Sequence, residues 1–376
     1  MSWKAITDIN AGKLKAGVAT GLRNSNLQTS EVEKSQTYKP FGLDNYVDFD
    51  AQDAAKNFED VRAMAVTNTM TAVMVEEEKI LLGGNVTAIG KPGAFTAADS
   101  NNAGPFTALT AYDFGVSALT LYGYLNGATG HASADAPDES DERTLTTFTT
   151  GSGKTAVALT IPAVRGAVAY NIYIGTHSGT RYYACTVTTT KPVIDSTLLA
   201  ALPGSGNVAN TLDKTADSLS FDGVIAQLAV SGSGAYFKDL AGATLTGDNA
   251  GGIVEWDAAL KDIYDRTRMG PTLILVGSQV AKDAKSKIAA NGSTTVLRIT
   301  ESVGAGGSIS GGLFLADYLN PYMQETVPVK THPFLPSGIV LFLGERVPYA
   351  NSNVPNVFEI DDPAAIAFDR GGWPSG

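Results

Sequence analysis

Apolar and polar residues change their spacing several times along the chain, and these changes divide it into five segments. Residues 1–50 are mostly polar and carry scattered aromatic side chains such as Tyr46 and Phe49. They follow neither the 3.6-residue period of an amphipathic helix nor the two-residue period of a half-buried strand. We therefore expect an extended N-terminal arm and loop that lie on another surface.

The second segment, residues 51–83, predicts a long helix. No Gly or Pro interrupts Ala51–Leu82, Asp50 and Asp53 favour a helix start, and Gly83-Gly84 provides a stop. One unbroken helix of this length would extend about 48 Å. Its apolar positions keep no strict heptad, so it should pack against a sheet and not form a coiled coil.

Residues 84–213 change to short runs rich in Thr, Val and Tyr, separated by Gly, Pro and Asp. Regular short strands with turn signals between them predict a β-sandwich. The runs are Ala118–Leu125, Ala156–Ile161, Ala169–Ile174 and Arg181–Thr188. The acidic stretch 131–142 (HASADAPDESDE) is expected to be a solvated loop. Because the segments on either side resemble one α+β unit, this sandwich is expected to be inserted into that unit.

The last two segments, 214–324 and 325–376, predict mixed helices and strands, so the fold class is α+β. The expected helices are Ser220–Val230 and Ser278–Ala290, and the expected strands are Pro271–Val276, Glu325–Lys330 and Ile339–Leu343. Between them lies a Gly-rich stretch, 303–312, that is expected to form a flexible loop.

Composition narrows the function classes. The chain has 376 residues, a net charge of −11 and a single cysteine, Cys185. One cysteine excludes an internal disulfide framework and any multi-cysteine metal site. The negative charge disfavours sequence-specific DNA binding, which depends on Lys and Arg at the phosphates. No apolar run approaches the ~20 residues that span a bilayer, and the start has no signal-peptide pattern, so we expect no membrane partner and synthesis in the cytoplasm.

Two Gly-rich motifs suggest nucleotide binding but fail in detail. Residues 151–155 read GSGKT, yet Phe148 stands where a phosphate loop needs its first glycine, and strand-like runs lie on both sides. A β-turn is the better interpretation. In 303–312, Ile309 occupies the position of the third glycine of a dinucleotide fingerprint. No nucleotide or other cofactor is therefore expected.

The remaining reactive side chains indicate no enzyme. His131, His177 and His332 have no second His or Cys at metal-ligand spacing, and each is expected at the surface or in a turn. No nucleophile motif of the GxSxG type occurs. Cys185 lies in an alternating run and is expected to be a buried or half-buried strand residue. We therefore assign no catalytic, cofactor-binding or metal-binding residue. The exposed arm and helix faces instead predict assembly with further copies.

Three stretches resemble a known family. They are FDGVIAQLAVSGSGAYFKDLAGATLT (221–246), GGIVEWDAALKDIYDRTRMGPTLILVGSQVAKDAKSKI (251–288) and VPVKTHPFLPSGIVLFLGERVPY (327–349). They are similar to the major capsid proteins of tailed bacteriophages with the Hong Kong 97 fold, and the order of arm, long helix and central domain also fits. The resemblance covers roughly 1–83 and 214–376. The stretch 161–190 is similar to fibronectin type III or immunoglobulin-like modules.

The resemblance implies a structural role. Residues 1–50 would be the arm and extended loop, 51–83 the spine helix of the peripheral domain, 84–213 an inserted module, 214–324 the central, axial domain, and 325–376 strands completing the peripheral domain. Hexamers and pentamers of the chain would close into an icosahedral shell around packaged double-stranded DNA, held non-specifically, and would be found in the virion. An insertion directly after Leu82 departs from the usual family pattern, and no residue matches the family's lysine–asparagine crosslink.

The resemblance also implies partners: further copies of the chain and, as separate proteins, scaffolding, portal and decoration proteins. Two alternatives stay open at this point. A surface-layer or tail-tube protein would assemble without a closed shell. A carbohydrate-binding or carbohydrate-active protein could also carry a fibronectin-like module, although only three tryptophans are present.

Overall fold

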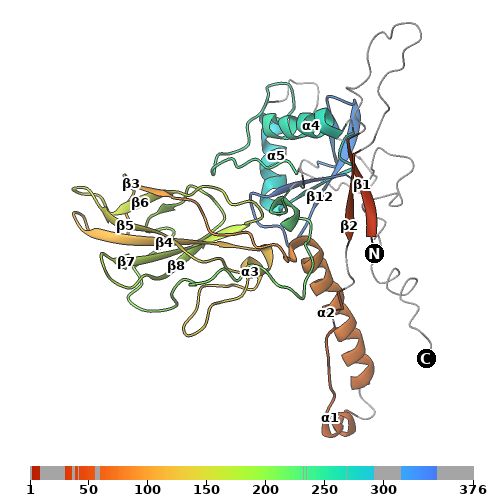
Figure 1. Ribbon diagram of the computed structural model, residues 1–376, viewed down its shortest axis with the longest axis horizontal. Helices are drawn as coiled ribbons and strands as arrows, with labels where there is room; N and C mark the ends of the chain where they lie inside the picture. Colours follow the sequence, from red (N-terminus) through yellow and green to blue (C-terminus); the bar gives the residue numbers. More distant parts are fainter. Residues whose placement is uncertain are drawn as a thin grey trace, which may run out of the picture.

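The computed structural model describes residues 2–8, 30–35, 39–40, 42–55 and 60–344, except 232, 234, 268 and 292–314. The fold is mixed α+β, with several sheets and few helices, which confirms the predicted class at this level. Figure 1 shows a sandwich of strands on one side, a smaller α/β body beside it, and a long helix that projects away from the place where the two meet.

The N-terminal segment contains more regular structure than its sequence pattern predicts. Strands β1 (Ser2–Asp8) and β2 (Ser30–Ser35) pair antiparallel, with Ser2 opposite Ser35 and a register shift between Ile6 and Asp8. They form a separate two-stranded sheet. The strands are too short and too polar to give a clear two-residue period, so sequence alone did not distinguish them from an extended arm.

The expected single helix over 51–82 is wrong, because the chain forms two helices there. These are α1 (Phe49–Ala54) and α2 (Val61–Gly83). The Asp60 side chain accepts hydrogen bonds from the backbone N–H groups of Arg62 and Ala63, both at 3.1 Å, and so starts α2 as its N-cap. Likewise Asp48, not Asp50, caps α1. The predicted stop is confirmed, since α2 ends at Gly83.

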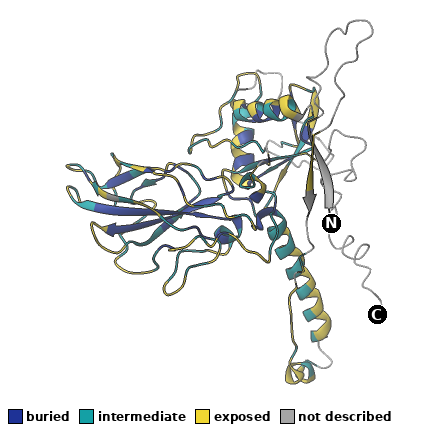
Figure 2. Ribbon diagram, viewed as in Figure 1, coloured by how far each residue is buried: buried dark blue, intermediate teal, exposed yellow. Residues whose placement is uncertain are grey.

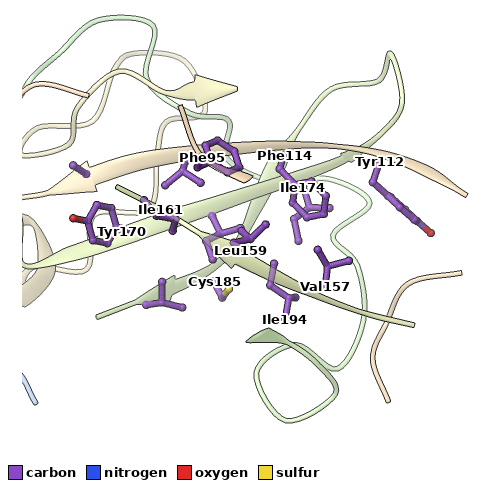
Figure 3. Close-up of a cluster of buried hydrophobic side chains, with 14 of the residues drawn as sticks. Phe95, Tyr112, Phe114, Val157, Leu159, Ile161, Tyr170, Ile174, Cys185 and Ile194 are labelled. Atoms are coloured by element: carbon purple, nitrogen blue, oxygen red, sulfur yellow. The ribbon is translucent and has the colours of Figure 1, made fainter. Parts of the chain in front are cut away.

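Two antiparallel sheets between residues 96 and 194 form a β-sandwich. Their strands are β3 (Thr96–Ser100), β4 (Ala111–Leu119), β5 (Arg143–Thr149), β6 (Ala156–Thr160), β7 (Ala169–Thr176), β8 (Tyr182–Val187) and β9 (Val193–Ile194). One sheet has the order β5-β4-β7-β8 and the other β3-β6-β9. Buried side chains of both sheets share one core, with Phe114 and Ile174 facing Val157, Leu159 and Ile194 (Figure 3).

Three of the four strand-like runs named from the sequence are strands, but Ala118–Leu125 is not. Its second half forms a short helix, α3 (Leu121–Leu125), whose N-cap Thr120 accepts a hydrogen bond from Gly123 N at 3.0 Å. The threonine side chain thus favours the start of a helix at a position where β-propensity alone predicts a strand.

The acidic stretch 131–142 is not a solvated loop throughout, since Glu139 and Ser140 are fully buried. The Glu139 carboxylate accepts hydrogen bonds from Tyr173 Oη, from Asn171 Nδ2 at 3.1 Å and from Gly130 N at 2.7 Å, and also from Ser117 Oγ. Because the face of the four-stranded sheet away from the core is polar, this acidic segment covers it and becomes buried.

The α/β body contains a sheet of order β11-β12-β10-β13, in which β10 and β12 are parallel. Its elements are α4 (Val254–Thr267), β10 (Leu273–Val276), α5 (Ser278–Asn291), β11 (Asp317–Asn320), β12 (Glu325–Thr331) and β13 (Val340–Leu343). Trp256 and Leu260 of α4 and Ala284 of α5 pack on Ile274 and Val327 of the sheet. The predicted strands and the predicted helix of residues 278–290 are confirmed.

The helix predicted for Ser220–Val230 is wrong, because only a 3-10 turn, η2 (Ala226–Leu228), forms there. The Asp222 carboxylate accepts hydrogen bonds from Val86 N and Thr87 N, at 2.8 and 2.9 Å. Gly223 N donates to Gly84 O at 2.8 Å. These contacts hold the stretch against the end of α2 in place of a helix. The Gly-rich loop 303–312 lies outside the described residues.

Candidate functional site

The GSGKT motif forms a turn between β5 and β6. Lys154 N donates to Gly151 O at 3.1 Å, and Gly153 adopts a positive φ of 68°. The Lys154 ammonium group contacts the Asn101 side chain. This confirms the β-turn interpretation of the motif, because no helix follows whose N-terminal amides could bind a phosphate.

The three histidines lie far apart in the fold, and each faces a carboxylate. The ring nitrogen to carboxylate oxygen distances are 3.3 Å for His131–Asp135, 3.1 Å for His177–Asp113 and 2.8 Å for His332–Glu78. His177 is exposed as predicted, whereas the side chains of His131 and His332 are only 14% exposed. Among the residues that the structure describes, no three His, Cys, Asp or Glu side chains gather as metal ligands would.

Cys185 lies on β8 and is buried, which confirms the sequence prediction. Burial raises the pKa of its thiol to about 12. Because the thiolate is the nucleophile of cysteine chemistry, this side chain is unreactive in the folded chain. The Glu76 carboxylate accepts hydrogen bonds from Lys79 Nζ and Tyr122 Oη, at 2.6 and 2.8 Å.

An apolar surface on the arm and α2 is exposed, and no other described part of the chain covers it. Of the seventeen large apolar side chains that are exposed in the described residues, eight lie between residues 43 and 75. We call them the arm–helix surface: Leu43, Tyr46, Phe49, Met64, Val66, Met70, Met74 and Val75. Such a concentration marks an interaction site more often than scattered exposed residues do.

Before its last two turns, helix α2 makes few contacts with the other described residues. It has 23 residues and therefore extends about 34 Å, but only Leu82 and Gly83 at its end are buried. Figure 2 shows exposed and partly exposed residues along the projecting part of the helix. Helices in proteins derive most of their stability from packing an apolar face against other elements, and the described residues give α2 little such packing.

Three exposed side chains form a stripe along one side of α2. Val66, Met70 and Met74 are 61%, 63% and 66% exposed and follow one another at four-residue spacing. Residues four apart lie on the same face of a helix, so the three side chains form one continuous apolar strip. This four-residue spacing is present in the sequence, although the apolar positions of the segment keep no strict heptad.

The segment before α1 runs beside α2 (Figure 1). Asn45 Nδ2 donates to Thr69 Oγ1 at 2.9 Å and, more weakly, to Ala65 O at 3.3 Å. An open groove of about 440 Å³ lies between this segment and the helix, and Val66 and Met70 contribute to its wall. Tyr46 of this segment and Phe49, the first residue of α1, are 90% and 79% exposed. The arm thus covers one side of α2 and adds aromatic rings to the exposed surface.

Comparison with protein family models, with curated proteins and with solved structures finds no match to this chain. Within the described ranges, no helix is both long enough and apolar enough to cross a bilayer. The function of the chain is therefore inferred from its own geometry.

Proposed function

We propose that this chain is a self-assembling structural protein, the major capsid protein of a tailed bacteriophage with the Hong Kong 97 fold. Its hexamers and pentamers form an icosahedral shell that encloses packaged DNA. The observation that carries the proposal is the arm–helix surface, which no other part of the described chain covers. Identical copies are the simplest partners, because each brings both an arm and an uncovered helix.

The energetics support repeated contacts between copies. Covering Met70 and Met74, which are 63% and 66% exposed, would contribute roughly 1–2 kcal/mol each. Association costs about 4–15 kcal/mol in lost translational and rotational freedom. A contact made by these two side chains alone is therefore too weak, whereas a contact that also covers the other six side chains of the arm–helix surface can offset the cost.

The element order and the quoted sequence stretches support the capsid assignment. An arm precedes the long helix, and an α/β body with strands near the C-terminal part follows. This chain departs from the usual pattern of that family at two points: its long helix is divided into α1 and α2, and the sandwich follows α2 directly. In the proposed shell the sandwich is displayed on the outer surface, DNA is held without sequence preference, and scaffolding, portal and decoration proteins are separate chains.

The test is microscopy of the expressed full-length chain together with sedimentation velocity. We expect closed particles of megadalton mass. Open tubes or flat lattices would instead favour a tail-tube or surface-layer protein, and a stable monomer at high concentration would contradict assembly altogether.

A matched pair of variants tests the stripe of Val66, Met70 and Met74. Met74→Lys places a charge in the apolar stripe, and lysine is a good helix former, which preserves the helix. Asn68→Lys introduces the same charge on an exposed position about 120° around the helix. We expect Met74→Lys to abolish particles while leaving a folded chain, and Asn68→Lys to assemble. Equal assembly by both variants would show that the stripe is not an interface.

A further inference from the structure

A third cluster of buried apolar side chains lies where α2, the sandwich and the body meet. Each part contributes residues: Leu82 from α2, Leu121 and Val168 from the inserted sandwich, and Ile225, Leu335 and Leu341 from the body. A module tethered by flexible linkers has a core of its own and shares none with its host. Here the inserted sandwich completes a core that belongs to all three parts.

The packing at the end of α2 leaves no free space. A Cβ atom added to Gly83 would lie 2.6 Å from Leu121 Cβ, and one added to Gly84 would lie 2.6 Å from Phe221 O. Contacts this close do not occur between real Cβ atoms and their neighbours, so both glycines are needed for the approach of the segments. The sandwich and the body therefore press directly on the last turn of the helix.

Hydrogen bonds fix both crossings of the chain between the body and the sandwich. Asp222 accepts from the backbone N–H groups of Val86 and Thr87, and Thr87 Oγ1 donates to the same carboxylate at 2.8 Å. Asn85, which is buried, donates through Nδ2 to Thr215 O at 2.9 Å. The outgoing and returning segments are thus bonded to each other, which removes the freedom that a hinge requires.

The last turns of α2 are also held by a side chain from each neighbour. Tyr122 of α3 donates to Glu76 Oε2 at 2.8 Å. On the body, His332 Nδ1 accepts from Phe334 N at 3.3 Å, so its other nitrogen carries the proton that points to Glu78 Oε1, 2.8 Å away. Glu76 and Glu78 thus connect the helix to the sandwich and to the body, respectively.

We infer that the inserted sandwich is a fixed positioning element that sets the direction of α2 relative to the body, and that the three parts form one cooperative unit at the base of the helix. A displacement of the sandwich by a bound partner then moves α2 directly. The body also depends on Leu121 for its own stability. The inference concerns a junction within one chain, so it goes beyond the proposed shell and does not depend on it.

The experiment is hydrogen–deuterium exchange on the unassembled full-length chain. Leu121→Ala is compared with Leu159→Ala, because both leucines are 1% exposed and lie in the inserted sandwich, but Leu159 contacts only the sandwich core. For Leu121→Ala we expect amide exchange at the end of α2 and in β13 to rise by at least about 30-fold, the lower end for a Leu→Ala cavity. Leu159→Ala should have its largest effect in β6 and its neighbouring strands.

The inference would be overturned if, in Leu121→Ala, exchange at the end of α2 and in β13 stayed within twofold of the unmodified chain. The sandwich would then be a tethered module. If Leu121→Ala does not fold, Val168→Ala decides, because it removes less volume from the same cluster and should raise exchange in the same segments by a smaller factor. Failure of shell formation leaves these measurements unaffected, so the two proposals fail separately.

Discussion

Removal of the buried Glu139 carboxylate should destabilise the sandwich strongly. Glu139→Ala leaves the donors of Ser117, Asn171 and Tyr173, all fully buried, without their acceptor. Burial and the neighbouring carboxylate raise the pKa of Tyr173, so its hydroxyl keeps the proton that it donates. Each buried unsatisfied donor costs about 1–3 kcal/mol, and water entering the space recovers part of this cost. We therefore expect a loss of about 2–4 kcal/mol.

The assay follows the free energy of opening from hydrogen exchange at the amides of β4 and β7, the two strands that carry these donors. Glu142→Ala is the control, because the partly exposed ion pair of Glu142 with Arg181 should contribute less than about 1 kcal/mol. Glu139→Gln keeps the shape and one acceptor oxygen, so its loss should lie between the other two variants. If Glu139→Ala cost no more than Glu142→Ala, the carboxylate would not hold the covering segment in place.

Two further predictions concern titration and reactivity. Burial, with Asp217 nearby, raises the pKa of Asp138, whereas hydrogen bonds from Thr211 outweigh burial and lower the pKa of Asp135. Asp138→Asn should therefore stabilise the chain at pH 7, and this gain should fade as the pH falls to about 4. Asp135→Asn should destabilise the chain at pH 7, and this loss should fade at still lower pH. If the free energy of unfolding, measured between pH 3 and pH 7, changed in the same direction for both variants, the assignment would be contradicted. Cys185 should react with a thiol reagent only on unfolding, and rapid labelling of the native chain would show that β8 is accessible.

The sequence predicted elements best where local signals agree with the tertiary structure. The strand before Gly277 and the helix from Ser278 were found because an apolar run, a glycine and a helix start follow each other directly. The stop after α2 was found for the same reason. Where one residue can serve two purposes, the prediction failed: Asp60 reads as an ordinary helix residue but acts as an N-cap.

The buried acidic segment could not be predicted from its own composition. Glu139 is buried because Ser117, Asn171 and Tyr173, far away in sequence, present donors on one face of a sheet. The donors come from two different strands, so the pattern exists only after the sheet has formed. By contrast, the stripe of Val66, Met70 and Met74 was present in the sequence at helical spacing. What could not be known was that the fold leaves it uncovered, because burial depends on the position of every other element.

The contrast between these two regions strengthens the case for assembly. The chain provides hydrogen-bond partners for most polar groups in its interior. Only four buried side-chain nitrogen or oxygen atoms in the described residues lack one. A chain that satisfies a buried carboxylate internally is not loosely folded. The exposed methionines therefore do not reflect poor packing in general, since those in the described residues (Met64, Met70 and Met74) all lie on α2. That helix is anchored at its base and, among the described residues, is covered beyond it only by the arm along one side, so we propose that its packing partner is a second copy of the chain.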